Sequence, residues 1–329
     1  MRFIVPILLL AALCWWFGLE PVEHALVRAS PRGLLVYLLL TAAIVLGAVL
    51  RWRLIGRAIG VSVSLGRLVV ARLAGDAVGA LVPSAKLAGE PLRVALARDA
   101  NTSTAQSTAG VALDRFMEII GNTVAVLAYA VVFYAMRGTA STGAGPLMVA
   151  GTMAILLGAL TALAIRLRRG HRPLAPLYGE RARRWAPRFG AWMDGVRVVE
   201  DHVVSFFHQH PRVFVIGLFA SVVIEALTVL QYHALLTAFG IALDLPTLCL
   251  VLLGGGIARA VPVPAGLGAL EATQVAVVGA AVGQPALGFV IGIVVRLHET
   301  LLLALGLVAL AYRGISPARL RLSAPQAGA

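Results

Sequence analysis

The sequence contains few charged residues and almost no lysine. Only 13% of its 329 residues are charged, whereas 60% are hydrophobic. A soluble domain carries about a quarter charged residues, so this composition excludes an ordinary soluble enzyme. Lys86 is the only lysine, and the formal net charge of +13 therefore comes almost entirely from arginine. Because the arginines cluster between apolar segments, the positive-inside rule explains them, and we expect no nucleic-acid partner.

Cysteine and the common enzyme motifs are equally scarce. Cys14 and Cys249 both lie in apolar runs, which excludes a disulfide framework and gives no metal-ligand spacing. The Gly-Leu-Gly at 266–268 lacks the preceding strand and third glycine of a dinucleotide site. The His-Glu pair at 298–299 lacks the second histidine of a zinc protease. We therefore expect no cofactor, no metal, no catalytic residues and no enzymatic activity.

Long apolar runs dominate what is present. A helix needs about 20 apolar residues to cross a bilayer, and several runs approach that length. The expected crossings are 3–19, 33–50, 107–136, 146–165, 213–239 and 286–312. The first is interpreted as a retained helix, because no small-residue cleavage site of a signal peptide follows it. The predicted class is an all-α polytopic membrane protein with about six transmembrane helices.

The distribution of arginine predicts how the chain is oriented in a cytoplasmic (inner) membrane. Arg51, Arg53, Arg57 and Arg67 form a stretch without acids that we expect in the cytoplasm. Residues 166–188 carry eight arginines against one glutamate and belong on the same side. Residues 20–32 and 240–246 are not arginine-rich and belong outside. Both termini are therefore predicted to be cytoplasmic.

Two segments fit neither a loop nor a single crossing in this topology. Residues 65–106 begin and end inside, and residues 247–285 begin and end outside. Proline and glycine at their centres free backbone groups that lipid cannot satisfy, so each segment is interpreted as a re-entrant helical hairpin with its tip in a polar cavity. The predicted tip residues are Pro83 and Gly89 in the first hairpin and Pro262, Pro264, Gly266 and Gly268 in the second.

A constant offset of 181 positions relates the two hairpins and the helices that follow them. Pro83, Glu90, Arg115 and Glu118 recur as Pro264, Glu271, Arg296 and Glu299. This duplication predicts an inverted-topology repeat with a binding site between its halves, as in many transporters. The first repeat would span 1–137 and the second 138–316, with a cytoplasmic amphipathic linker over 166–212 and a disordered cytoplasmic tail over 317–329.

Charged residues inside apolar segments are candidate binding residues, because a charge near the bilayer centre is costly. An arginine and a glutamate three positions apart on a helix can pair, and the guanidinium fork suits phosphate oxygens. Two interpretations of these pairs stay open. They could form a binding site for a lipid headgroup, or a salt bridge that braces each hairpin. The predicted substrate-binding residues are Arg115, Arg296, Glu90, Glu271, Glu118, Glu299, Lys86 and Asp114.

Apolar residues recur at three- and four-residue steps between Phe189 and Phe206. Such spacing indicates an amphipathic helix. It could lie on the cytoplasmic leaflet, with the arginines of 166–188 bound to anionic lipid headgroups, or pack on the protein's own base.

Several of these stretches resemble the membrane domain of lysylphosphatidylglycerol synthases and its stand-alone flippase-like relatives. The resemblance covers roughly 33–312, and is carried by Arg51-Trp52, 83–93, Asp114-Arg115, 262–271 and Arg296. It implies a multi-pass domain that moves or presents phospholipids, or lipid-linked glycans and isoprenoids, between leaflets. One branch of the family is linked to hopanoid metabolism. No soluble acyltransferase domain follows Tyr312, so we expect no aminoacyl transfer from tRNA.

Two other functions stay open. One is an accessory subunit of a lipid- or glycan-modifying system, with a membrane enzyme as its partner. The other is a proton-coupled transporter of small solutes. A groove open sideways to lipid would favour lipid movement, whereas an enclosed, water-filled site would favour the solute transporter.

Overall fold

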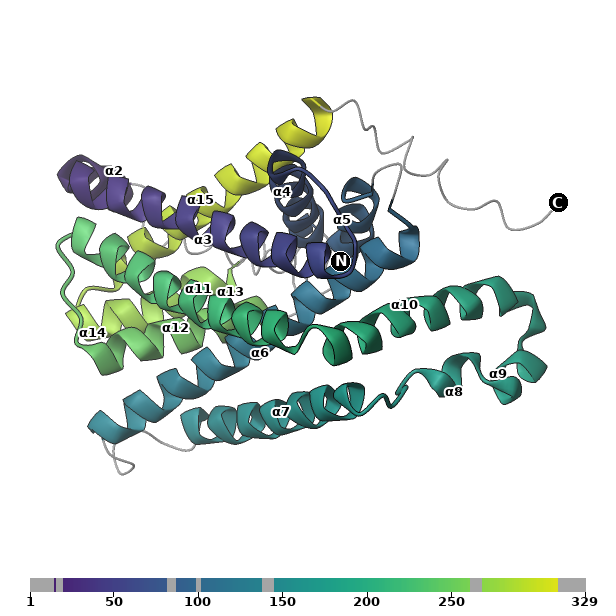
Figure 1. Ribbon diagram of the computed structural model, residues 1–329. Helices are drawn as coiled ribbons and strands as arrows, with labels where there is room; N and C mark the ends of the chain where they lie inside the picture. The colour runs from purple at the N-terminus through teal and green to yellow at the C-terminus, as the bar shows by residue number, and fades with distance from the viewer. Residues whose placement is uncertain are drawn as a thin grey trace.

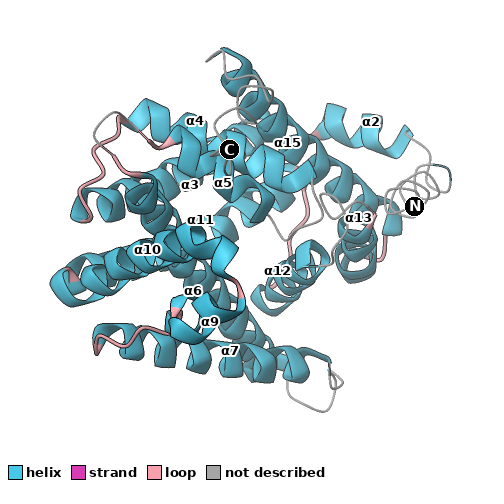
Figure 2. Cartoon of the chain, turned by 90° about the vertical axis from the view of Figure 1, so that its right-hand side faces the viewer, coloured by secondary structure: helices cyan, strands magenta, loops and turns pink. Residues whose placement is uncertain are grey.

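The structure is a computed structural model that describes residues 15, 20–81, 87–98, 102–137, 145–260 and 268–312. All regular structure in these ranges is helical, which confirms the predicted all-α class (Figure 2). The helices are α2 (Glu20–Arg28), α3 (Pro31–Ala58), α4 (Leu65–Leu81), α5 (Glu90–Leu96), α6 (Thr104–Arg137), α7 (Gly145–Arg168), α8 (Ala175–Tyr178), α9 (Glu180–Trp185), α10 (Gly190–Gln209), α11 (Pro211–Ala238), α12 (Leu245–Ala260), α13 (Ala269–Gln274), α14 (Ala280–Val282) and α15 (Pro285–Tyr312). Two 3-10 turns (Leu87–Gly89 and Pro187–Phe189) and a π-helical turn (Val275–Gly279) complete the described structure.

Five of these helices are long and apolar enough to cross a membrane. They are α3, α6, residues 147–168 of α7, α11 and α15. Each coincides with one expected crossing, so the chain is a multi-pass membrane protein. The remaining expected crossing, 3–19, lies outside the described residues except for Trp15.

The expectation that Arg51 lies in a cytoplasmic loop was wrong. Helix α3 continues to Ala58, and Arg51 lies within it, only 3% exposed. Its Nε donates a hydrogen bond of 2.9 Å to Oδ1 of Asp114. Hydropathy alone would end the helix at this charged residue. The helix continues because the Asp114 carboxylate neutralises the Arg51 guanidinium. Arg57, near the end of α3, is exposed.

The two halves of the molecule pack on each other through reciprocal contacts (Figure 1). Helices α3 and α11 run antiparallel, with Gly33 against Ala238 and Gly47 against Ile224. Helix α4 of the first half packs on α15 of the second, and α12 of the second packs on α6 of the first. An inverted repeat requires this exchange, because its equivalent helices run in opposite directions.

Hydrogen bonds between α3 and α11 show the same reciprocity. Gln231 Nε2 donates to Thr41 Oγ1 at 2.6 Å, and Arg51 Nη1 donates to Ser221 Oγ at 2.9 Å. The two donors, Arg51 and Gln231, are 180 positions apart, and so are the two hydroxyl acceptors, Thr41 and Ser221. These contacts support the repeat, whereas its domain limits at 137 and 138 stay a prediction.

The arms of both hairpins are shorter than a crossing. Helix α4 has 17 residues, α5 has 7 and α12 has 16. A full crossing needs about 20, so these lengths favour the re-entrant interpretation. The tips over 82–86 and 261–267 lie outside the described residues, and with them the predicted residues Pro83, Lys86, Pro262, Pro264 and Gly266.

Two predicted tip glycines fall in the described ranges and have different roles. Gly89 lies against Gly75, and a Cβ at position 89 would clash with the Gly75 carbonyl group, so glycine lets α4 and α5 touch. Gly268 has a φ of 77°, a conformation that glycine adopts readily. Its N–H donates to Glu271 Oε2 at 2.9 Å at the start of α13.

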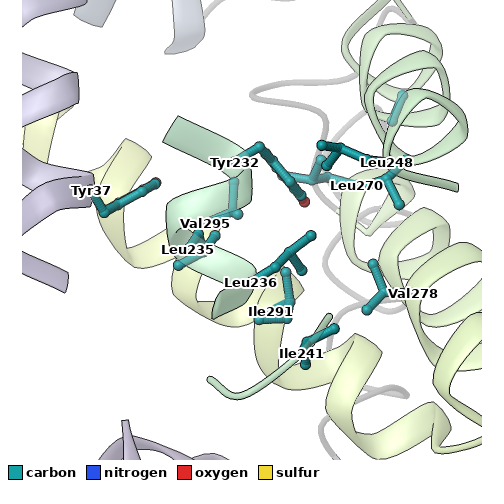
Figure 3. Close-up of a cluster of buried hydrophobic side chains, with 12 residues drawn as sticks. Tyr37, Tyr232, Leu235, Leu236, Ile241, Leu248, Leu270, Val278, Ile291 and Val295 are labelled. Carbon is teal, nitrogen blue, oxygen red and sulfur yellow. The ribbon is translucent and has the colours of Figure 1, made fainter. Parts of the chain in front are cut away.

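A buried apolar cluster holds the second hairpin to the rest of the fold (Figure 3). Tyr232 and Leu236 of α11 face Leu270 of α13 and Ile291 of α15 in this cluster. The cluster therefore packs α11, α13 and α15 together beside the charged residues of the second repeat.

The linker packs partly on the protein and partly exposes its apolar side chains. Phe206 and Phe207 near the end of α10 are buried against Ile55 and Leu113. In Figure 1 the start of α10 lies away from α11, and there Trp192 is 57% exposed. The amphipathic helix therefore uses one end to cover the base of the bundle. Binding of anionic headgroups by 166–188 stays a prediction.

Glu200 of α10 is a buried acid in the linker. It is 2% exposed and accepts a hydrogen bond of 2.6 Å from the Leu174 amide and another from the Tyr178 hydroxyl. Burial and the contact with Glu200 raise the pKa of Tyr178. Glu200 thereby ties α8 to α10.

The predicted orientation can be tested by labelling single cysteines with a membrane-impermeant reagent, in a background with Cys14 and Cys249 replaced by alanine. We expect cysteines at the exposed positions Arg57 and Arg169 to react only from the cytoplasmic side. A cysteine at the exposed position Asp244 should react only from outside. Labelling of position 169 from outside would contradict the proposed orientation.

Candidate functional site

Arg115 joins the two glutamates of the first repeat. Its Nη2 lies 2.6 Å from Oε1 of Glu90 on α5, and its Nη1 lies 2.8 Å from Oε1 of Glu118 one turn further along α6. All three side chains are about 15% exposed. The predicted helix-face pair is therefore present, and it also holds the return arm of the first hairpin.

Arg296 makes the equivalent contacts in the second repeat. Its Nε and Nη2 donate to the two carboxylate oxygens of Glu271 at 2.7 and 3.2 Å, and its Nη1 lies 3.2 Å from Oε2 of Glu299. A bidentate guanidinium–carboxylate pair is among the strongest ion-pair geometries. Each arginine thus pairs with the hairpin glutamate of its own repeat.

Asp114 is the centre of a larger ionic network in the first repeat. The side chain is fully buried, and its Oδ1 accepts from Arg51. Its Oδ2 accepts from Arg93 Nη2 at 2.7 Å and from Arg72 Nη1 at 3.3 Å. One buried carboxylate therefore neutralises groups on α3, α4 and α5, and the network stabilises their packing on α6.

The network continues through the acids next to Asp114. Arg72 lies 2.9 Å from Asp76 and 3.1 Å from Glu118, and Arg93 lies 3.1 Å from Glu90. Its formal charges cancel, since four arginines face four acids. The members are Arg51, Arg72, Arg93, Arg115, Asp76, Glu90, Asp114 and Glu118.

Sequence reasoning missed Arg72, Asp76 and Arg93. The guanidinium of Arg93 is wholly buried and stacks over the Trp52 ring at 4.5 Å, a favourable cation–π contact. Its spacing of three residues from Glu90 was a usable signal, as was the spacing of four between Arg72 and Asp76. The segment was instead interpreted as a short, polar hairpin whose individual charges were not paired.

The second repeat lacks most of this network. The residues 181 positions after Arg93 and Asp114 are Gln274 and Val295. Gln274 is 1% exposed, and neither of its side-chain amide atoms has a hydrogen-bond partner among the described residues. The larger ionic network of the described residues therefore lies in the first repeat, and in the second Arg296 pairs with Glu271 and Glu299.

A groove of about 1060 Å³ lies beside Arg115 and Glu90, between α5, the first half of α6 and the end of α15. Most of its lining is apolar, including Leu92, Val111 and Phe116 on its walls. Its polar lining residues are Glu90, Arg98, Thr104, Thr108 and Arg115. At about 1.5 Å per residue, Arg115 lies about 16 Å along α6 from Thr104, roughly half the thickness of the hydrocarbon core.

The second repeat is closely packed at the corresponding place. A Cβ at Gly288 would lie 2.5 Å from the Gln274 carbonyl oxygen, and one at Gly292 would lie 3.0 Å from Glu271 Cα. Phe289, 181 positions after the groove residue Thr108, is fully buried. The return arm of the second hairpin therefore lies directly on α15.

The structure brings the predicted residues together as two groups. Glu90, Asp114, Arg115 and Glu118 form one, and Glu271, Arg296 and Glu299 form the other. Neither Asp114 nor Arg296 lines the groove, so a site shared by Arg115 and Arg296 stays a prediction. Among the described residues no group of three His, Cys, Asp or Glu side chains suits a metal ion.

These features define a polytopic, all-α membrane protein with an intramembrane ionic network and an apolar groove beside it. Residues 3–315 match the family described as the lysylphosphatidylglycerol synthase TM region. The chain therefore belongs to this family, as the sequence motifs indicated, and is tied by it to lipid metabolism. It is also similar to a UPF0104 membrane protein of Methanothermobacter thermautotrophicus, with 25% identity over 95% of each chain.

Proposed function

We propose that the protein binds a membrane lipid in the groove and moves it, or presents it, between the two leaflets. The substrate is a phospholipid or a lipid-linked glycan or isoprenoid. The observation that carries the proposal is an apolar groove with a charged cluster at its inner end, in a chain whose family is named for a lipid-synthase membrane region.

The groove matches both parts of an amphipathic ligand. Ile119, at its apolar wall, is 38% exposed, so acyl chains could enter from the surrounding lipid. A polar headgroup that leaves water needs hydrogen-bonding partners, since an unpaired polar group costs several kcal/mol in hydrocarbon. Glu90 and Arg115 supply such partners about halfway across the bilayer.

In this proposal the ionic network has two roles. It braces the first hairpin through the contacts described above. Arg115 also offers a donor to a lipid phosphate, because its buried Nε has no hydrogen-bond partner among the described residues. The phosphate would compete with Glu90 and Glu118 for the guanidinium.

We place the protein in the cytoplasmic membrane with both termini inside, and we propose no enzymatic step of its own. The arginines of 166–188 would bind anionic lipid headgroups at that surface. They follow α7 directly, where Arg169 is exposed.

Filling the groove should stop lipid movement. Ala112 is exposed and lines the groove, and Ala112→Trp would occupy space that a lipid needs. We expect the rate of leaflet exchange of labelled lipids, in liposomes containing the purified protein, to fall at least tenfold.

The matched control is Val131→Trp on the same helix, at a position that is 56% exposed and does not line the groove. It should exchange lipid at the rate of the unmodified protein. Equal rates for the two variants, or no exchange by the unmodified protein, would rule out the proposed function.

A further inference from the structure

We infer that Arg98, at the mouth of the groove, binds the lipid headgroup and makes the site selective for anionic, phosphate-bearing lipids over zwitterionic ones. The inference rests on the proposed function and names the substrate class of the same groove. It is carried by the charge balance of the groove, by the way the Arg98 backbone is held, and by the other polar residues that line the groove.

Among the described residues that line the groove, one cation has no counterion. Three of these residues are charged: Arg98, Arg115 and Glu90. Arg115 is neutralised by Glu90 and Glu118, whereas the exposed Arg98 forms no ion pair with any described residue. The described lining residues therefore carry a net charge of +1, located on Arg98. Such a charge attracts an anion and is unfavourable for the cationic part of a zwitterionic headgroup.

The backbone that carries Arg98 is held in place by Arg67 of α4. Arg67 Nε donates to the Leu96 carbonyl at 2.7 Å, and its Nη2 donates to the carbonyl of Arg98 itself. On the other side, Ser107 Oγ donates to the Val94 carbonyl at 2.9 Å. The backbone of residues 94–98 is thus held by side chains of both α4 and α6. A residue whose backbone is already fixed loses less entropy when it binds a ligand.

The other polar residues of the groove are suited to a phosphate. Thr104 and Thr108 line it from the first turns of α6, where the Thr108 hydroxyl also donates to the Thr104 carbonyl at 2.8 Å. Thr104 begins this 34-residue helix, whose N-terminus carries a partial positive charge. Guanidinium, hydroxyl groups and a helix N-terminus all favour phosphate oxygens. The acid that lines the groove, Glu90, is already paired with Arg93 and Arg115.

The test compares the exchange of two labelled phospholipids in liposomes of otherwise identical composition. One is phosphatidylglycerol, which is anionic, and the other is phosphatidylcholine, which is zwitterionic. We expect the unmodified protein to exchange phosphatidylglycerol faster, with a preference that weakens as salt is added. Arg98→Gln should reduce this preference about tenfold, the effect of losing a charge-assisted hydrogen bond. Arg98→Lys should keep part of it.

Two further variants separate headgroup binding from a structural effect. Arg67→Gln removes the residue that positions Arg98 and should weaken the preference as Arg98→Gln does. Arg57→Gln alters an exposed arginine that does not line the groove and should change nothing.

The outcomes distinguish this inference from the proposed function. If Arg98→Gln keeps the full preference while Ala112→Trp still abolishes exchange, the headgroup role of Arg98 is wrong and the groove function stands. An equal loss for both lipids in Arg98→Gln would also overturn the inference, because it indicates a structural role. If the unmodified protein exchanges neither lipid, both proposals fail.

Discussion

Asp114→Ala should lower the free energy of unfolding by roughly 3–5 kcal/mol, enough to prevent most of the protein from accumulating in a folded form. The carboxylate is fully buried and contacts Arg51, Arg72 and Arg93. Its removal leaves excess positive charge in a water-poor interior, and such an uncompensated charge is far more costly than the loss of one hydrogen bond. The effect would be measured as folded yield and as thermal unfolding of the purified protein in detergent.

The matched control is Asp194→Ala, which breaks an ion pair with Arg183 on the linker. The Asp194 side chain is 57% exposed, and exposed pairs contribute little to stability. A normal yield and melting temperature for Asp114→Ala would contradict the role assigned to the network.

The second repeat suggests a variant that should recover part of this loss. It has valine and glutamine where the first has Asp114 and Arg93. Asp114→Val combined with Arg93→Gln removes one charge of each sign, and replacing buried ion pairs by groups of similar volume is often tolerated. We expect it to be more stable than Asp114→Ala, because Arg51 and Arg72 keep their contacts to Glu118, and Arg72 also keeps Asp76.

The helices were predictable because their apolar runs are long and uninterrupted. Hydropathy located five crossings that the structure describes, and the offset of 181 identified the residues of both arginine clusters. The same hydropathy criterion that located these crossings placed Arg51 outside the helix that contains it. Hydropathy treats an arginine as the end of a crossing, and Asp114, which compensates Arg51, is 63 positions away in the sequence.

The groove and the wider network depend on distances that no sequence pattern contains. Arg72 and Arg93 meet Asp114 only because Gly75 and Gly89 let α4 and α5 touch. The groove lies between residues of α5 and α6, whereas the equivalent arm of the second hairpin lies directly on α15 at Gly288 and Gly292. The residues at the groove and at its counterpart in the second repeat are related by the same offset of 181. The repeat therefore predicts similar packing at both places and cannot predict that only the first has a groove.

Arg115→Ala and Arg296→Ala should each lower lipid exchange tenfold or more. Each replacement removes charge-assisted contacts worth roughly 1.5–3 kcal/mol. Arg296→Ala also takes away the guanidinium that pairs with Glu271, whereas in Arg115→Ala Glu90 keeps its contact with Arg93. Lysine at either position should restore only part of the activity, because it provides a point charge without the planar fork. Folded protein should still be recovered, since insertion depends on the apolar helices. Exchange would be measured in liposomes at equal amounts of folded protein.

Loss of activity in these variants has two explanations, a missing headgroup contact and a loosened hairpin. Reversing Arg115 and Glu118 cannot separate them, because Arg51 and Arg72 also contact Glu118 and would face a new arginine. The second repeat provides a cleaner test. Arg296 contacts Glu271 and Glu299, and the positions equivalent to Arg93 and Asp114 hold the uncharged residues Gln274 and Val295.

The variant that separates the explanations is Arg296→Met combined with Glu271→Gln. Methionine keeps an unbranched apolar side chain, and glutamine keeps an oxygen that can accept from the Gly268 N–H, so the hairpin no longer holds a stranded carboxylate. We expect this double variant to melt at a higher temperature than Arg296→Ala and yet to exchange lipid at least tenfold more slowly than the unmodified protein. That result would support a headgroup contact, because stability returns without activity. Recovery of full exchange together with stability would show instead that Arg296 only braces the hairpin.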